Sequence, residues 1–382
     1  MSLMVAKKLI RDLKKNGYQA YLVGGVVRDF LMRKEFSDID ITTNAKPFDV
    51  MKLFKTIPTG LKYGSVTVLY EDYKFEVTTF RKDGPTCDFR HPDSVIYSSE
   101  VKDDIERRDF TMNGILMDER QNIYDYIGGQ QDIHDKVIRA IGDPNARFNE
   151  DALRILRALY FQSKLGFSIE PKTKQAMMDH RLLIANLANE RVHAELIKIL
   201  QGKYLKLALE TMVETRIHEV LPGLEKGILF TSKLEQMPFI DTFFSLSFTL
   251  NNGVIPSVWT FSNIHRHKYL KASEVALKVP GMVDNVTLYH YGLETCLLAN
   301  KVNYYLGKSK HLSKIITKVY DELPIKSELD LALSSQEIMT IMNKKAGSWL
   351  GNLKKEMIND VLTKHVLNTK ESLTKYLEKK RG

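Results

Sequence analysis

The sequence predicts an α+β fold at the N-terminus followed by an all-helical remainder. Residues 1–141 alternate helix-like and strand-like patterns, which is typical of a small mixed sheet with helices. From Ala146 onward the apolar residues recur at helical spacing, and no segment reads convincingly as a strand. The sequence Ile-Gly-Asp-Pro at residues 141–144 is a turn signal that marks a boundary between the two parts. A chain of 382 residues is long enough for two or more domains.

The expected elements follow in order from the pattern of apolar residues. Helices are expected over Val5–Asn16 and over residues 26–32. Short apolar runs rich in β-branched and aromatic residues predict strands over Ala20–Val23, Ile39–Thr42, Ser65–Tyr70 and Lys74–Phe80. Breaks near residues 202, 222, 251–256, 280 and 324 divide the second part into helices of ordinary length.

A glycine pair follows the first expected strand, in the segment Leu-Val-Gly-Gly-Val-Val-Arg-Asp at residues 22–29. Gly24 and Gly25 lack Cβ, so the backbone can turn sharply and its N–H groups can face an anion. Arg28 would add a positive charge near the start of the next helix. These three residues are therefore candidates for binding a triphosphate, and a plain structural turn is the alternative interpretation.

Two aspartates stand two residues apart at the second expected strand. Because side chains alternate across a strand, Asp38 and Asp40 point to one face while Ile39 and Ile41 point into the core. Neighbouring carboxylates repel each other, and Mg²⁺ prefers such oxygen ligands together with substrate phosphates. Asp38 and Asp40 are therefore the candidate catalytic residues and the ligands of two Mg²⁺ ions. A solvated edge strand with two surface acids is the alternative.

Composition favours a nucleic-acid partner and a reducing compartment. The net charge is +9, and residues 301–382 hold 16 Lys and Arg against 9 Asp and Glu. Only Cys87 and Cys296 are present, which argues against a disulfide framework or a zinc site and fits the cytoplasm. The N-terminus lacks the apolar run of a signal peptide, and residues 237–261 are too interrupted to span a bilayer.

The glycine segment followed by Asp-Ile-Asp resembles the head of the bacterial class II tRNA nucleotidyltransferases, the CCA-adding enzymes, and of the related bacterial poly(A) polymerases. These enzymes belong to the polymerase-β nucleotidyltransferase superfamily. Segments between residues 329 and 351 resemble the Gram-positive branch of the family. The resemblance implies a catalytic head over residues 1–141, a base-recognising helical neck over 142–205, a helical body over 206–300 and a basic, tRNA-binding helical tail over 301–382.

Two shorter segments also resemble motifs of this family. Residues 107–114, Arg-Arg-Asp-Phe-Thr-Met-Asn-Gly, end in Gly where the family usually has Ala. This resemblance implies that Arg108, Asp109 and Asn113 bind the nucleotide and its ribose. Because residues 107 and 108 are adjacent, a helix would point their two arginine side chains to different sides. Residues 189–196 resemble a helical motif in which Glu190 and Arg191 would brace the base-reading helix.

Residues 147–157, Arg-Phe-Asn-Glu-Asp-Ala-Leu-Arg-Ile-Leu-Arg, closely match the family's base-reading motif. Asp151 and Arg154 stand three residues apart, so on one helix they would share a face. A carboxylate and a guanidinium can pair with the amino group and ring nitrogen of cytosine or adenine, whereas guanine and uracil present the reverse order. Asp151, Arg154 and Arg157 are therefore expected to select the base. A surface salt bridge is the alternative, and Tyr160 stands where the family usually has another Arg.

The segment between residues 81 and 95 resembles the family's flexible loop, which is needed for the switch from adding C to adding A. Asp88 and Arg90 match its Asp-x-Arg-x-Pro core, which favours complete CCA addition over CC addition. A plain surface loop is the alternative. On the preceding strand, Glu76 is a candidate for a third metal-binding carboxylate, and the sequence leaves a structural role equally open.

The predicted function is template-independent addition of C, C and A to the 3′ end of tRNA from CTP and ATP, with release of pyrophosphate. A poly(A) polymerase, a CC-adding enzyme or an A-adding enzyme would share every catalytic residue named above. Two other classes are a catalytically inactive RNA-binding relative and a transferase that acts on a small molecule such as an aminoglycoside. We expect a cytoplasmic protein with no membrane partner, and a homodimer is left open.

Overall fold

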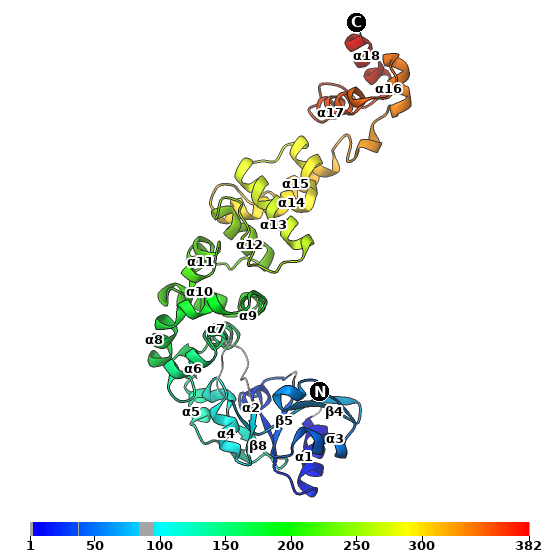
Figure 1. Cartoon of the computed structure of the whole chain (residues 1–382). Coiled ribbons are helices and arrows are strands. Elements are labelled where there is room, and N and C mark those ends of the chain that lie inside the picture. Colours follow the sequence, from blue (N-terminus) through cyan, green and yellow to red (C-terminus); the bar gives the residue numbers. More distant parts are fainter. Residues whose placement is uncertain (1–2, 37, 84–94, 382) are drawn as a thin grey trace. The chain divides into compact units, whose positions relative to one another are not determined.

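The computed structural model describes residues 3–36, 38–83 and 95–381, which fold into two compact units (Figure 1). Unit 1 comprises Met1–Leu221 and Ile228–Met237, and unit 2 comprises Pro222–Gly227 and Pro238–Gly382. The finer division into head, neck, body and tail stays a prediction. Among the described residues, no helix combines the length and the hydropathy that crossing a bilayer requires.

The centre of the head is a mixed sheet with seven strands among the described residues. In spatial order the strands are β3 (Thr56–Ile57), β4 (Ser65–Tyr70), β5 (Tyr73–Thr79), β2 (Asp40–Thr43), β1 (Ala20–Val23), β8 (Leu116–Met117) and β9 (Ile123–Tyr124). Strands β2 and β5 pair in parallel, whereas the other neighbouring pairs are antiparallel. The four strands expected from the sequence are present, with bounds shifted by at most one residue.

Buried apolar side chains pack helix α1 against the sheet. Helix α1 (Leu3–Lys15) buries Leu9, Ile10 and Leu13 in the same core as Ile41 of β2 and Val77 of β5. The remaining head helices are α2 (Gly25–Leu31), α3 (Pro47–Leu53), α4 (Val101–Glu106) and α5 (Gly129–His134). Because Ile39 and Ile41 enter this core, the carboxylate of Asp40 between them is directed to the opposite face of the sheet.

Two smaller strand pairs lie outside the main sheet. Strands β6 (Arg81–Asp83) and β7 (Val95–Tyr97) are antiparallel, whereas β10 (Val137–Ile138) and β11 (Ser168–Ile169) are parallel. The expectation of no strand after residue 146 is therefore wrong. A strand of two residues gives no alternation along the sequence, and β11 exists because its backbone pairs with β10.

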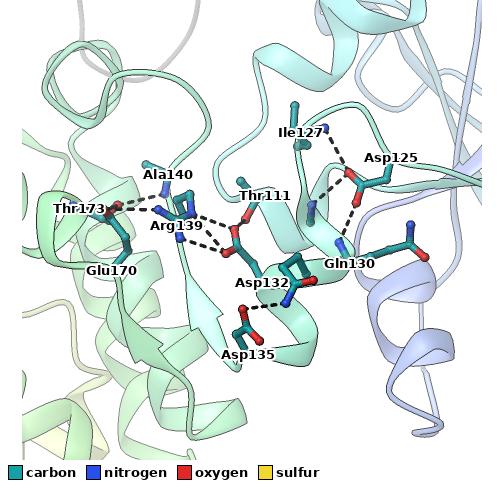
Figure 2. Close-up of polar contacts among 12 residues, drawn as sticks. Thr111, Asp125, Ile127, Gln130, Asp132, Asp135, Arg139, Ala140, Glu170 and Thr173 are labelled. Atoms are coloured by element: carbon teal, nitrogen blue, oxygen red, sulfur yellow. Dashed lines mark hydrogen bonds and ion pairs between the residues drawn. The ribbon is translucent and has the colours of Figure 1, made fainter.

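Side-chain contacts extend the β10–β11 pairing into a polar junction (Figure 2). Asp132 accepts hydrogen bonds from the Thr111 hydroxyl at 2.6 Å and from Arg139 Nε at 3.1 Å. Arg139 also lies 3.5 Å from Glu170, whose carboxylate accepts from the backbone N–H and the hydroxyl of Thr173 at 2.6 and 2.9 Å. This chain of contacts ties the head to the helices that follow it.

The rest of unit 1 is mainly helical, and several of its helices pack on α7. These helices are α6 (Pro144–Glu150), α7 (Leu153–Leu165), α8 (Pro171–Asp179), α9 (Asn189–Leu200) and α10 (Leu205–Glu214), with α11 (Glu225–Thr231) at the boundary of the units. Gly202 allows the end of α9 to approach α7, because a Cβ there would lie 2.3 Å from the Ser163 hydroxyl. Helices α7 and α9 therefore lie side by side.

Helices account for the regular structure of unit 2 within the described chain. They are α12 (Ile240–Leu250), α13 (Asn263–Lys278), α14 (Asn285–Tyr305), α15 (Ser313–Asp321), α16 (Ser335–Met342), α17 (Ser348–Leu362) and α18 (Lys370–Arg381). Short 3-10 helices also occur among the described residues of the two units, at Leu61–Tyr63, Thr111–Asn113, Arg181–Asn186, Ile217–Val220 and Glu328–Asp330. Phe244, Phe248 and Tyr269 stack in the core between α12 and α13, so aromatic packing holds these two helices together.

Candidate active site

Gly24 joins β1 to α2 and brings the backbone close to two charged side chains. Its φ of 79° lies in the left-handed region that favours glycine. A Cβ at this position would lie 3.6 Å from both Asp40 Oδ2 and Arg108 Nη1. The β1–β2 pairing also places Val23 opposite Asp40. The glycine turn and the second aspartate, predicted separately from the sequence, therefore meet at one point.

Negative charge gathers around Asp40. The parallel register of β2 and β5 sets Glu76 directly beside Asp40, and the exposed Asp38 precedes it by two residues. Burial raises the pKa of Asp40 to about 6, and the negative charges of Glu76 and then Asp38 act in the same direction, whereas Arg108 opposes them. The Asp40 carboxylate therefore needs more positive charge than its described neighbours supply.

The donor set around Asp40 fits a divalent cation that also takes ligands from a substrate. Carboxylate oxygens are the protein ligands that Mg²⁺ prefers, and substrate phosphates usually complete its coordination. Within the described residues, no three side chains of His, Cys, Asp or Glu lie close enough together to enclose an ion by themselves. Whether Glu76 joins Asp38 and Asp40 as a ligand stays a prediction.

Asp104 holds both arginines of the 107–114 segment. Its fully buried carboxylate accepts from Arg107 Nε at 2.8 Å, from Arg108 Nη2 at 3.0 Å and from the Thr42 hydroxyl at 3.0 Å. Burial alone would raise the pKa of Asp104, but the charges of Arg108 and Arg107 lower it below the usual value. The expectation that the two arginines point to different sides is wrong, because α4 ends at Glu106 and both side chains turn back to Asp104.

Arg28 is part of a buried network. Only 2% of its surface is exposed, its Nε donates to Asp29 at 2.9 Å, and its Nη1 donates to Asn113 Oδ1 at 2.8 Å. The guanidinium carbon also lies 5.3 Å from the ring centroid of Phe161 in α7. The structure therefore brings Arg28 together with Asn113, while direct contact between Arg28 and a triphosphate stays untested.

Asp109 links the same network to α7. It accepts from Asn113 Nδ2 at 3.0 Å and from Arg157 Nε and Nη2 at 2.8 and 2.5 Å. Burial alone would raise the pKa of Asp109, but the Arg157 charge and the hydrogen bonds lower it to about 2. Two residues that were assigned separate roles, ribose binding and base selection, thus form one ion pair.

The base-reading segment is interrupted at Asp151. Helix α6 ends at Glu150, Asp151 has φ −146° and ψ 99°, and α7 begins at Leu153. The expectation that Asp151 and Arg154 share the face of one helix is therefore wrong. Arg154 is buried and donates to Glu150 at 3.0 Å and to the carbonyl oxygen of Arg107 at 2.8 Å.

Asp151 is instead held by its own backbone neighbour and by Arg191 of α9. Its Oδ1 accepts from the Leu153 N–H at 3.0 Å, and its Oδ2 lies 3.3 Å from Arg191 Nη2 of α9. The predicted bracing contact of Arg191 is therefore present. Of the loop residues, Asp88 and Arg90 lie outside the described ranges, so their assignment stays a prediction.

Sequence reasoning gave no role to Asp29 and Asp104, which organise the arginines of the site. A signal was available for Asp104, because it stands three and four residues before the arginine pair, a spacing typical of ion pairs on a helix. No such spacing exists for Asp29, which is adjacent to its partner.

The family models cover most of the chain. Residues 20–139 match the model described as the Poly A polymerase head domain, and residues 166–228 match "Probable RNA and SrmB- binding site of polymerase A". Residues 254–377 match the tRNA nucleotidyltransferase domain 2. With the carboxylates beside the glycine turn, these matches define a nucleotidyltransferase with a head of the poly(A) polymerase type.

Curated relatives narrow this class. The CCA-adding enzyme of Bacillus licheniformis is 36% identical over 392 residues, which cover 98% of this chain and 97% of that protein. The CCA-adding enzyme of Bacillus subtilis is 35% identical over 396 residues, with the same two coverages. The chain belongs to the family of CCA-adding enzymes, and the resemblance inferred from its motifs is confirmed.

Solved structures agree with this assignment. The crystal structure of the Bacillus stearothermophilus CCA-adding enzyme in complex with CTP matches with a TM-score of 0.81 and 32% identity, covering 100% of this chain and 98% of that chain. The Thermotoga maritima CCA-adding enzyme complexed with tRNA matches with a TM-score of 0.64 and 17% identity, covering 98% and 94%. The second match supports the fold alone, and together they confirm the predicted fold class.

Proposed function

We propose that this chain adds C, C and A to the 3′ end of tRNA, with CTP and ATP as the nucleotide donors. This conclusion rests on the similarity to CCA-adding enzymes, which are 36% and 32% identical over nearly the whole chain. The carboxylates beside the glycine turn are the groups proposed to carry out the reaction. The 3′-hydroxyl oxygen of the RNA bonds to the α-phosphorus of the nucleotide, the bond to the β-phosphate oxygen breaks, and pyrophosphate leaves. The hydroxyl proton passes to solvent.

Asp38 and Asp40 are the residues proposed to hold a divalent cation, with Glu76 as a further candidate. Such a cation would neutralise phosphate charge and make the RNA hydroxyl a better nucleophile. The surroundings of Asp40 support this proposal, because Glu76 and Asp38 place negative charge beside it, and burial followed by the Glu76 charge raises its pKa. We further propose that the cation is Mg²⁺ and that two ions are bound.

Gly24, Gly25 and Arg108 are the residues proposed to receive the triphosphate. Gly24 lets phosphate oxygens approach the backbone, since no side chain stands between Asp40 and Arg108. The buried Nε of Arg108 has no hydrogen-bond partner among the described residues, so it remains available to an anionic ligand. Arg28 acts mainly by orienting Asn113, which with Asp109 is proposed to contact the ribose.

Asp151, Arg154 and Arg157 are proposed to select the base. Arg157 donates a hydrogen bond to Asp109, so a base bound beside Arg157 would lie next to a residue proposed to contact the ribose. Among the described residues, Arg154 donates three hydrogen bonds, to Glu150 and to the carbonyl oxygens of Arg147 and Arg107, and a guanidinium has five N–H groups, so donors remain for a base. Cytosine and adenine offer a ring-nitrogen acceptor to such a donor, whereas guanine and uracil offer an N–H at the same place.

The test supplies the purified protein, Mg²⁺ and a tRNA transcript that lacks its last three nucleotides. CTP alone should yield two added C residues, and CTP with ATP should yield CCA followed by a stop. Long A tails would identify a poly(A) polymerase, a halt at CC a CC-adding enzyme, and A added only to a CC end an A-adding enzyme. Absence of transfer with retained tRNA binding would identify an inactive RNA-binding relative. A cytoplasmic location and a homodimer stay predictions.

A further inference from the structure

Two tyrosines and three lysines gather around the C-terminal end of α7, and none of them belongs to the site described above. This neck cluster consists of Tyr160, Lys164, Lys198, Lys203 and Tyr204. The ammonium groups of Lys164 and Lys198 each lie 5.7 Å from the ring centroid of Tyr160, and Lys203 lies 5.5 Å from that of Tyr204. The backbone N–H of Tyr204 donates to the carbonyl oxygen of Ser163 at 2.7 Å, which holds Tyr204 beside α7.

Most of the positive charge of the neck cluster is not compensated. Lys198 lies 3.0 Å from the buried carboxylate of Glu195, whereas Lys164 and Lys203 form no ion pair with any described residue. Lys164, Lys203 and Tyr204 are exposed, and the ring of Tyr160 is half-buried. Lysines beside exposed aromatic rings are the chemistry that single-stranded nucleic acid recognises, through phosphates and bases respectively.

The neck cluster adjoins the catalytic head. The ring centroids of Tyr160 and Phe161 are 4.9 Å apart, and Phe161 in turn lies 5.3 Å from the guanidinium carbons of Arg28 and Arg157. A cavity of about 370 Å³ opens next to Lys164, within the range of about 300–1,000 Å³ that is usual for ligand sites. Its lining residues are Asp29, Lys34, Glu35, Phe36, Lys164 and Leu165.

This cavity connects the neck cluster to the segment that carries the catalytic aspartates. Lys34 and Phe36 stand only a few residues before Asp38 and Asp40. The lining carries two lysines, Lys34 and Lys164, two carboxylates, Asp29 and Glu35, and the aromatic ring of Phe36. An RNA end bound along the cluster and this cavity would lie beside Lys34 and Phe36, which precede Asp38 and Asp40 in the sequence.

We propose that the neck cluster and this cavity hold the single-stranded 3′ end of the tRNA, with a base stacked on Tyr160 and phosphates bound by Lys164, Lys198 and Lys203. The proposal rests on the proposed function and adds the residues that position its RNA substrate. Three lysines from α7, α9 and the following connection fit successive phosphates of a chain better than one compact triphosphate. The triphosphate has its own candidates at Gly24 and Arg108.

Stacking on an aromatic ring suits the changing substrate of this reaction. The RNA terminus differs before each of the three additions, so a site that read its base edge would reject some of them. Every base has a π-face, so stacking on Tyr160 tolerates all of them. A base that takes the place of one lysine ammonium over the ring also frees that ammonium to reach the neighbouring phosphate.

The experiment compares Tyr160→Ala, Tyr160→Phe and Lys164→Gln with the wild-type enzyme in CTP addition to a tRNA lacking its last three nucleotides. Tyr160→Ala should raise the KM for tRNA about tenfold, because it removes one base stack, and Tyr160→Phe should stay within about twofold. Lys164→Gln should raise the same KM and lower the salt slope by about 1. The KM for CTP should stay within about twofold in all three variants.

Lys172→Gln is the matched control, because it removes an exposed charge from α8 of the same unit, outside the cluster. The proposal is overturned if Tyr160→Ala leaves the KM for tRNA unchanged, if Tyr160→Phe is as impaired as Tyr160→Ala, or if the KM for CTP rises equally. If Tyr160→Ala does not fold, the double variant Lys164→Gln, Lys203→Gln carries the test, since both lysines are exposed and lack ion pairs.

Failure of the proposed function gives a different result. A wild-type protein that adds no nucleotide would overturn CCA addition, and the neck cluster is then tested by binding alone. Fluorescence anisotropy with a labelled single-stranded RNA ending in CC should show weaker binding to Tyr160→Ala than to the wild type and to Tyr160→Phe. Equal affinity of all three proteins would overturn the neck cluster as an RNA site.

Discussion

At the scale of single residues, Asp109 is the centre of the buried network that joins Asn113 to Arg157. It is nine-tenths buried, and it receives hydrogen bonds from Arg157, Asn113 and the backbone N–H of Phe110. A carboxylate in this setting is stabilised in its charged form although burial opposes that form. Its ionisation therefore couples the stability of unit 1 to pH.

We expect Asp109 to contribute about 2 kcal/mol to the free energy of unfolding at neutral pH, from a pKa of about 2 in the folded chain against 3.8 in the unfolded chain. Because the folded pKa is the lower one, the contribution is fully present above about pH 4. It is lost as the pH falls through about 2. Denaturant unfolding of the wild type and of Asp109→Asn at several acidic pH values measures it.

The difference in unfolding free energy between these two proteins should shrink as the pH is lowered. A pH-independent difference would mean that Asp109 stabilises the fold through packing or neutral hydrogen bonds rather than through its charge. Asp179→Asn serves as the control, because this exposed aspartate lies on α8 outside the network.

Asp40→Asn should lower the rate of nucleotide transfer by more than about a hundredfold, because it removes charge where the reacting phosphates must be held. The affinity for tRNA should change little, since this carboxylate is not part of a basic RNA-binding surface. Single-turnover transfer and filter binding measure the two quantities. Asp49→Asn on α3 is the control, and substantial transfer by Asp40→Asn would remove Asp40 from the catalytic assignment.

The residues that carry charge next to glycine were predictable, whereas their partners were not. Asp38, Asp40 and Gly24 became candidates because the paired carboxylates and the glycine turn stand close together in the sequence. Asp29 has no spacing signal in the sequence, and the spacing of Asp104 predicts ion pairs with Arg107 and Arg108 but not that Arg108 lies beside Gly24. Ion-pair partners far apart in sequence, such as Asp109 and Arg157, require the tertiary structure.

At the scale of elements, the break between α6 and α7 determines the directions in which Asp151 and Arg154 point. Asp151 occupies this break in an extended conformation, and Arg191 of α9 holds its carboxylate. A continuous helix would have directed residues 151 and 154 from one face. The break instead lets Arg154 turn back toward the head while Asp151 faces α9.

Asp151→Ala should increase the misincorporation of G and U by about tenfold or more relative to C, since these bases would no longer face a carboxylate with which they cannot pair. The KM for CTP should rise by a smaller factor than the factor by which the selectivity for C over G and U falls. Sequencing of tRNA ends after incubation with all four nucleotides measures the choice. Wild-type selectivity in this variant would contradict the base-reading role, and Asp179→Ala provides the same chemical change on α8 as a control.

Longer elements were predictable from periodicity, and the shortest ones were not. The strands β1, β2, β4 and β5 contain four to seven residues, enough for apolar residues to alternate visibly. Strands of two residues, such as β8, β10 and β11, carry no pattern of their own and form because a partner strand is present. The helix break at Asp151 was missed because residues 147–157 keep helical spacing through it.

At the scale of the whole molecule, charge is distributed unevenly along the chain. The net charge is +9, and residues 301–382 carry 16 basic against 9 acidic side chains. Binding of tRNA should therefore weaken by at least about a hundredfold between 50 and 200 mM salt, because lysine–phosphate contacts release counterions. The KM for CTP should depend on salt far less.

Replacement of Lys344 and Lys345 by Gln should reduce the slope of log Kd against log salt by about 2, one for each lost phosphate contact. The matched control replaces Lys46 and Lys55, two exposed lysines of the head, and should leave the slope unchanged. Equal effects of the two pairs would mean that the tail has no special part in holding RNA.

The order of β2 between β1 and β5 has a consequence for biosynthesis. The carboxylates come together only when β5, some 36 residues after β2, has paired with it, and the nucleotide network closes only once Arg157 has met Asp109. A ribosome that makes about 5–20 residues per second would complete these elements roughly 11–45 seconds before it reaches the last C-terminal residue. The nascent protein would thus assemble the proposed nucleotide site while residues 301–382, which are predicted to bind tRNA, are still being translated.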